Sequence, residues 1–267
     1  MKIESQGVVS TKGLVLQAVL LVAVLVIFFP GTFLRAETLV PGDLLYNHAP
    51  WTYHIDEVTQ PKRMVRALEA LVLINKFHWM AADQLREGYW PLWDPYEYGG
   101  LPLLANMQSA VFYPPRLIHF FITDGPTATT IYILLKFFLC GMIAYVAAVL
   151  LGLPQFAARF VSVAWMMGGY NNLWCYWMEP DVAAWFPLLF LGAEFVIQER
   201  SRAGFMLTAV AGSLTLLGGH PETAFSFAFF LGVYTLIRLA LGRYSAKRWF
   251  YVLSVLGLGW CVALLFT

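Results

Sequence analysis

Long runs of apolar residues constrain what this chain can fold into more than any other feature of its sequence. A helix needs about 20 predominantly apolar residues to cross the hydrocarbon core of a bilayer, and residues 13–34 supply such a run without a charged side chain. After a long polar interval, further apolar runs occupy residues 128–151, 157–178, 182–197, 204–218, 222–241 and 249–266. We therefore predict an all-α polytopic membrane protein with about seven transmembrane helices.

The composition supports this class and excludes others. Hydrophobic residues make up 60% of the chain and charged residues 12%, whereas typical soluble domains carry about 25% charged residues. The formal net charge of +1 provides no electrostatic footprint for nucleic acid, which is excluded as a partner. Cys140, Cys175 and Cys261 lie far apart in apolar stretches, so we expect neither a disulfide framework nor a cysteine metal site.

The distribution of lysine and arginine predicts which side of the membrane each loop faces. With a cytoplasmic N-terminus, the cytoplasmic segments hold nine cationic residues and the two short outer loops hold none, as the positive-inside rule requires. The nine are Lys2, Lys12, Arg159, Arg200, Arg202, Arg238, Arg243, Lys247 and Arg248. We expect the first span to stay uncleaved, because residues 13–34 are longer than the apolar core of a signal peptide.

Residues 35–126 form a long first outer loop, which at this length should contain elements of its own. Within it, residues 61–86 predict an amphipathic helix, because apolar residues recur every three or four positions and Pro61 suits the first helical position. This helix would lie in the membrane interface or pack on the rest of the loop. Residues 127–267 would hold about six further spans.

The stretch 89–100 combines tyrosine and tryptophan rings with prolines, paired glycines and the carboxylates Asp94 and Glu97. The prolines and glycines predict a turn-rich segment without a regular element. One interpretation is an aromatic belt at headgroup depth. The other is a sugar platform, in which the rings stack on pyranose faces and the two carboxylates accept hydroxyl protons.

Polar residues gather at the predicted outer ends of the later spans. Glu179 and Asp181 occupy one short outer loop, and His220 and Glu222 occupy the next. Polar groups at membrane depth are costly and commonly line a cavity or a functional site. Short loops are polar in any case, so both interpretations stay open at this point.

Three ionisable residues near or within the spans need a specific environment. Asp43 follows the first span closely, where a carboxylate is well placed to act as a general base; a turn cap is the alternative. Lys136 and Glu194 lie nominally inside the membrane. We consider an interhelical ion pair between them, unless Glu194 reaches the cytoplasmic edge.

Several ordered motifs resemble those of the bacterial YfhO-like membrane proteins. They are Gly42-Asp43, Pro91-Leu92-Trp93-Asp94-Pro95, residues 100–115 (GLPLLANMQSAVFYPP) and Gly219-His220-Pro221-Glu222. That family is similar to the GT-C glycosyltransferases, integral membrane enzymes whose first outer loop bears a catalytic Asp or Glu. These enzymes take sugar from a polyprenyl-phosphate carrier on the outer face. The resemblance implies a GT-C-like fold, and we treat residues 1–267 as a single membrane domain.

Carried onto this sequence, the resemblance makes Asp43 the catalytic base. It makes Asp94, Asn106 and Gln108 candidates for binding the substrate. From the residues themselves we add three further binding candidates, which are Glu97, His220 and Glu222.

Inverting glycosyl transfer also needs a positive charge beside the departing phosphate. Arg116 is the first candidate for this role and Arg35 the second, because arginine suits bidentate contact with phosphate. A divalent cation held by outer carboxylates would serve the same purpose. The sequence contains no dedicated metal motif, so the cofactor and any metal ligands stay unassigned.

These inferences predict a membrane glycosyltransferase of the bacterial plasma membrane, multi-pass, with its active face outside. Its partners would be a polyprenyl-phosphate-linked sugar donor, a cell-envelope glycan or polymer as acceptor, and membrane lipid. A lipid or solute transporter or flippase, and a non-catalytic membrane scaffold, are the alternatives. YfhO-like proteins usually continue through several more spans and an outer domain, so we expect this chain to be an N-terminal part of a longer protein.

Overall fold

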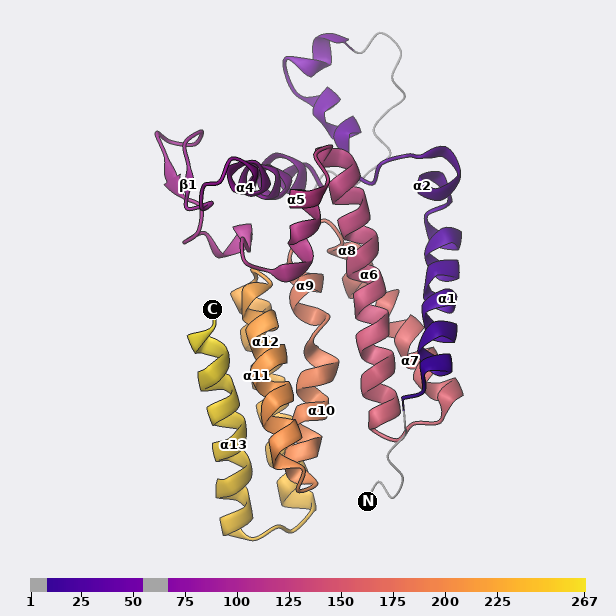
Figure 1. Ribbon diagram of the computed structural model, residues 1–267, viewed down its shortest axis with the longest axis vertical. Helices are drawn as coiled ribbons and strands as arrows, with labels where there is room; N and C mark the ends of the chain where they lie inside the picture. Colours follow the sequence, from indigo (N-terminus) through magenta and orange to yellow (C-terminus); the bar gives the residue numbers. More distant parts are fainter. Residues whose placement is uncertain (1–8, 55–66) are drawn as a thin grey trace. The chain divides into compact units, whose positions relative to one another are not determined.

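The computed structural model describes residues 9–54 and 67–267, and helices make up most of this part of the chain (Figure 1). These residues form two compact units. The first unit comprises the chain up to Leu25, then Lys136–Trp174 and Met178–Thr267, and the second comprises Val26–Leu135 with Cys175–Trp177. The single membrane domain over residues 1–267 stays a prediction.

Five helical segments of the described chain are long and apolar enough to cross a membrane. They are α1 (Thr11–Phe28), α6 (Gly125–Leu150), the segment Glu179–Ile197 with α9 (Glu179–Ala183) and α10 (Phe186–Ile197), α12 (Pro221–Leu241) and α13 (Ala246–Leu265). A shorter apolar helix, α11 (Ser201–Leu217), accompanies them. The chain is therefore an all-α polytopic membrane protein, as the apolar runs predict.

Two of the predicted spans differ from the structure. The run 13–34 does not form one helix, because α1 ends at Phe28 and a separate helix, α2 (Pro30–Arg35), begins at Pro30. Proline lacks the N–H that would continue the helix and disfavours helical geometry in the residue before it. The run 157–178 is also divided, into α7 (Gln155–Met166) and α8 (Gly169–Leu173), with the flexible pair Gly168-Gly169 at the break.

Small residues let the helices of the first unit approach closely. Helix α11 packs against α10 and α13, and Figure 1 shows these helices running beside one another. A Cβ added at Gly204 would lie 2.5 Å from Val196 Cγ2 and 2.6 Å from the carbonyl oxygen of Gly192, and one at Gly212 would lie 2.9 Å from Ala263 Cβ. Close backbone approach of this kind is the usual way in which helices associate in membranes.

The apolar core of this packing lies between α10, α11, α12 and α13. Its fully or nearly buried side chains are Leu189, Ala193, Val196, Ile197, Ala211, Leu231, Leu239, Val252 and Leu256. The same helices turn large apolar side chains outward along their other faces, for example Phe229, Phe250 and Leu258. An apolar exterior of this extent fits lipid rather than water.

The second unit is built around the helix predicted over residues 61–86. Residues 61–66 lie outside the described chain; from Ala67 the prediction is confirmed, with α3 (Ala67–Glu69), one π-helical segment (Ala70–Asn75) and α4 (Lys76–Arg86). Arg86 then donates hydrogen bonds to the backbone carbonyls of His119, Phe120 and Ile122. It thereby satisfies carbonyl groups at the end of the short helix α5 (Ile118–Phe121).

Short elements complete the second unit. Strands β1 (Trp93–Asp94) and β2 (Leu101–Pro102) form an antiparallel pair, so the turn-rich stretch 89–100 contains one regular element that its prolines and glycines did not predict. Among the described residues, 3-10 helices span Gly42–Asn47, Trp51–His54, Met107–Ser109 and Pro114–Leu117.

Candidate functional site

His220 is at the centre of a polar cluster in the first unit, at the start of α12. Its Nδ1 accepts a hydrogen bond from the backbone N–H of Thr223 at 3.3 Å, so it caps the helix. Because Nδ1 is an acceptor, the ring proton of a neutral His220 lies on Nε2. That atom lies 3.6 Å from Oε1 of Glu179 and 3.5 Å from Oε2 of Glu222.

The two carboxylates around His220 have different surroundings. The Glu179 side chain is 9% exposed, whereas that of Glu222 is 78% exposed. A single histidine thus links a buried carboxylate of α9 to an open carboxylate of α12. Such a chain of titratable groups can pass a proton or hold a hydroxylated ligand at its open end.

Tyr170 of α8 extends this cluster. Its hydroxyl lies 3.1 Å from the hydroxyl of Thr223. The phenol is therefore a hydrogen-bonding group of the cluster.

Lys136 of α6 forms a buried ion pair with Asp181 of α9, two residues after Glu179. Nζ of Lys136 lies 3.5 Å from Oδ2 of Asp181, and both side chains are almost completely buried. The pair proposed from the sequence between Lys136 and Glu194 is wrong. Glu194 instead contacts Arg238, whose Nε lies 3.0 Å from its Oε1, and the hydroxyl of Tyr234.

The candidate base, Asp43, belongs to the second unit. It lies in the first turn of the 3-10 helix Gly42–Asn47 and is partly buried. The 3-10 helix follows α2 after a short segment without regular secondary structure, so Asp43 lies near the first span in the sequence. Its role as a base stays a prediction.

Asp94 and Glu97 form a cluster with Lys76 of α4. Nζ of Lys76 lies 2.9 Å from Oδ2 of Asp94 and 2.6 Å from Oε1 of Glu97. Burial alone would lower the pKa of Lys76, but its hydrogen bonds to Glu97 and Asp94 raise it above the ordinary value. Only 1% of the Asp94 side chain is exposed, and its Oδ1 accepts a hydrogen bond from the backbone N–H of Tyr96. Both carboxylates thus turn towards a lysine.

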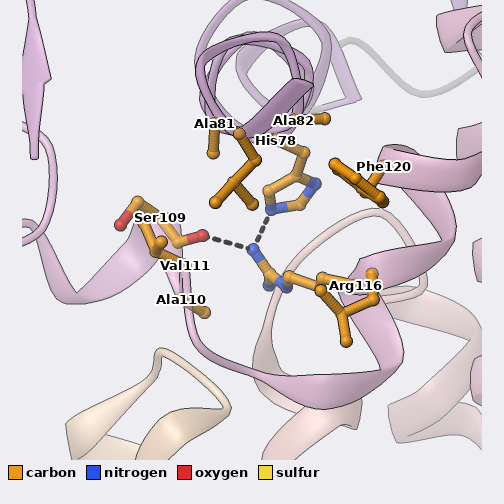
Figure 2. Close-up of a pocket in the computed structure, with 10 residues that line it drawn as sticks. His78, Ala81, Ala82, Ser109, Ala110, Val111, Arg116 and Phe120 are labelled. Carbon is orange, nitrogen blue, oxygen red and sulfur yellow. Dashed lines mark hydrogen bonds between the residues drawn. The ribbon is translucent and has the colours of Figure 1, made fainter. Parts of the chain in front are cut away.

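Arg116, the candidate phosphate ligand, is buried in a network of its own. Its Nη1 donates to the carbonyl oxygen of Ser109 at 2.9 Å and contacts Nε2 of His78, as Figure 2 shows. Its Nε donates to the hydroxyl of Tyr132 at 3.1 Å. The guanidinium borders a narrow pocket of about 310 Å³, counted with its opening to solvent. The second candidate, Arg35, is exposed and pairs with Glu37 at 2.7 Å.

Asn106 and Gln108 form the turn next to this pocket. Oδ1 of Asn106 accepts a hydrogen bond from the backbone N–H of Gln108 at 3.1 Å and so caps the 3-10 helix Met107–Ser109. The Gln108 side chain is exposed. In this structure Asn106 fixes the local backbone, and Gln108 is available for contact with a ligand.

The structure thus gathers the predicted site residues in two sets. Asp43, Asp94, Glu97, Asn106, Gln108 and Arg116 belong to the second unit, and His220 and Glu222 to the first. Tyr170, Thr223 and His78 complete these networks, although no pattern in the sequence marks them. Within residues 9–54 and 67–267, no group of three or more His, Cys, Asp or Glu side chains is placed to hold a metal ion.

Comparison with curated proteins finds a partial similarity. A stretch of 84 residues is 40% identical to the "Uncharacterized protein YfhO" of Bacillus subtilis (strain 168). The matched segment covers 29% of this chain and 9% of the length of that relative. No protein-family model and no solved structure matches this chain. The chain is therefore a multi-pass helical membrane protein with partial similarity to YfhO.

Proposed function

We propose that this protein is a glycosyltransferase of GT-C type in the bacterial plasma membrane. It transfers a sugar from a polyprenyl-phosphate carrier to a cell-envelope glycan or polymer on the outer face. The similarity to YfhO, together with the motifs around Asp43 and Asp94, supports a YfhO-like membrane protein. The step from there to sugar transfer is our proposal.

The observation that carries this proposal is the setting of Asp43. It is a partly exposed carboxylate in a short helical turn soon after the first span, where a carrier lipid would present its sugar. We assign the acceptor's proton to Asp43, which takes it as the new glycosidic bond forms and the carrier phosphate departs.

The other candidate residues receive supporting roles in this proposal. Gln108 is exposed and is assigned to a sugar hydroxyl. His220 and Glu222 belong to the other unit, and their contact with substrate stays a prediction from the sequence. Asp94, Glu97 and Asn106 hold the outer segment in shape. Arg116 or a divalent cation would balance the departing phosphate.

The test compares Asp43→Asn with Asp124→Asn in membranes that contain the full-length protein, using a labelled polyprenyl-phosphate sugar. A general base contributes about 10²–10⁴-fold, so Asp43→Asn should lose transfer by that factor and still bind the donor. Asp124→Asn is the matched control because it makes the same exchange at an exposed residue that caps α6. Asparagine caps helices equally well, so this variant should keep its structure. Equal activity of the two variants would exclude Asp43 as the base.

A transporter or flippase of lipid or solute is the second candidate. The division of residues 155–173 into α7 and α8, and the buried pair of Lys136 and Asp181, favour it, because transporters use interrupted helices and charged groups within the membrane. Carrier or solute movement across proteoliposomes without sugar transfer would support this candidate. If the protein showed neither sugar transfer nor transport, a non-catalytic scaffold would be the remaining candidate.

A further inference from the structure

The segment 89–104 of the second unit, which we name the aromatic hairpin, has an unusual surface. Its two strands pair at Trp93 with Pro102 and at Asp94 with Leu101. Aromatic and apolar side chains point outward over its whole length: Tyr89, Trp90, Leu92, Trp93, Tyr96, Tyr98, Leu101 and Leu104 are all exposed. Tyr96 and Tyr98, near the turn, are 81% and 95% exposed.

The hairpin is held in place although its rings are exposed. The amide of Gln84 donates to the carbonyl oxygen of Trp93 at 2.8 Å, and the backbone N–H of Leu103 donates to the carbonyl oxygen of Leu92 at 2.8 Å. Gly100 has φ +120°, and a Cβ there would lie 2.5 Å from Cζ2 of Trp93. The exposure of the rings is therefore fixed by a closely packed turn.

The charges of the hairpin point the other way. Asp94 and Glu97 both contact Nζ of Lys76 on α4, and their side chains are only 1% and 23% exposed. The hairpin therefore presents far more aromatic surface than carboxylate surface. A carbohydrate site needs such polar groups next to its stacking rings, because a pocket fixes its ligand through a few placed polar contacts. A membrane interface needs only rings with an apolar body and a polar tip.

The unit that carries the hairpin is also attached to the membrane at two points. It contains the last residues of α1 and the first part of α6, both of which are candidate membrane spans. A surface of Trp, Tyr and Leu in such a unit stays close to the bilayer. Its contact with lipid is therefore an intramolecular event at high effective concentration rather than an encounter from solution. Continuity with the membrane-spanning helices thus selects lipid as its partner.

We propose that the aromatic hairpin inserts into the boundary between the lipid headgroups and acyl chains and anchors the second unit to the membrane surface. The rings enter the boundary while the internal pairing of Asp94 and Glu97 with Lys76 keeps bare carboxylates out of it. This inference does not depend on the proposed sugar transfer. It favours the aromatic belt over the sugar platform for residues 89–100.

The experiment measures the depth of spin labels in the full chain, reconstituted in phosphatidylcholine and phosphatidylglycerol vesicles. Single cysteines replace Tyr96 or Tyr98 in a background without the native cysteines. Glu87→Cys, an exposed polar position just after α4, is the water reference. Leu258→Cys, an exposed apolar position of α13, is the bilayer reference. Depth follows from collision with oxygen compared with a water-soluble nickel chelate.

We expect the labels at positions 96 and 98 to lie about 5–10 Å into the boundary, the depth of interfacial apolar side chains, whereas the label at position 87 reports water. Water-like accessibility at 96 and 98 would overturn the proposal. If labels with water-like accessibility also became immobilised when a soluble oligosaccharide was added, the proposal would be overturned in favour of a glycan site. Because the measurement involves no sugar transfer, failure of the proposed activity would not alter its outcome.

Discussion

At the scale of single residues, buried charges of the first unit pair between helices: Lys136 of α6 with Asp181 of α9, and Glu194 of α10 with Arg238 of α12. The ion pair of Lys136 is with Asp181 rather than Glu194, because partners in a helical bundle depend on which helices pack together. One sequence does not contain that information. His220 and Glu222 were both candidates from the sequence, but their contact, 3.5 Å between Nε2 and Oε2, was not predicted.

Arg116 provides the prediction at this scale. Its planar guanidinium contacts Ser109, His78 and Tyr132, which come from three different segments. Lysine has one compact ammonium group and cannot reproduce this arrangement. We expect Arg116→Lys to lower the free energy of unfolding by about 1.5–3 kcal/mol, the usual loss for hydrogen bonds to a charged group, measured by thermal unfolding in detergent.

Arg35→Lys is the matched control for this change. Arg35 is exposed and pairs with Glu37, and exposed ion pairs contribute little to stability. The Arg35→Lys variant should therefore unfold at the same temperature as the unchanged protein. The prediction would be contradicted if Arg116→Lys unfolded normally and lost only affinity for a polyprenyl phosphate. That result would leave the proposed contact with the carrier phosphate as the role of Arg116, without a part in stability.

At the scale of elements, apolar periodicity located helices well and their ends poorly. Residues 67–86 are helical as predicted, and α12 and α13 begin within a few residues of the predicted runs. The breaks at Pro30 and at Gly168-Gly169 were missed because apolar length alone was counted. Both breaks follow from backbone chemistry that is visible in the sequence.

Helix packing supplies the prediction at this scale. Gly204→Ala would place a methyl group 2.5 Å from Val196 Cγ2 and 2.6 Å from a backbone oxygen, and backbone cannot move aside cheaply. We expect a loss of about 1–3 kcal/mol, as for other overpacked interiors. Gly257→Ala in α13 meets nothing within 4 Å and should be neutral or stabilising by up to about 1 kcal/mol.

The free energies of unfolding of these two variants are compared in mixed micelles that contain an increasing fraction of denaturing detergent. Both exchange glycine for alanine within a helix, so the difference between them isolates the contact of α11 with α10. Equal stability of the two variants would mean that α10 and α11 do not pack through Gly192 and Gly204 in the folded protein.

At the scale of the whole molecule, composition and apolar length were enough to predict a polytopic helical protein. The number of long spans differs from the number of apolar runs: seven runs correspond to five long spanning segments, one shorter helix and one divided run in the described chain. The sequence supplied candidate site residues, but it did not show how they are arranged. The burial of a carboxylate such as Asp94 depends on tertiary contacts, here the contact with Lys76.

Orientation in the membrane is the prediction that belongs to the whole molecule. Nine cationic residues in one set of short segments against none in the other predict a cytoplasmic N-terminus, with Tyr53 and Glu222 outside and Arg200 inside. Single cysteines at these three exposed positions, in a background without native cysteines, should react accordingly with a membrane-impermeant maleimide on intact cells. Positions 53 and 222 should be labelled and position 200 spared until the cells are permeabilised. The reverse pattern would place Asp43, His220 and Glu222 in the cytoplasm and exclude transfer on the outer face, because a sugar presented outside could then meet none of them.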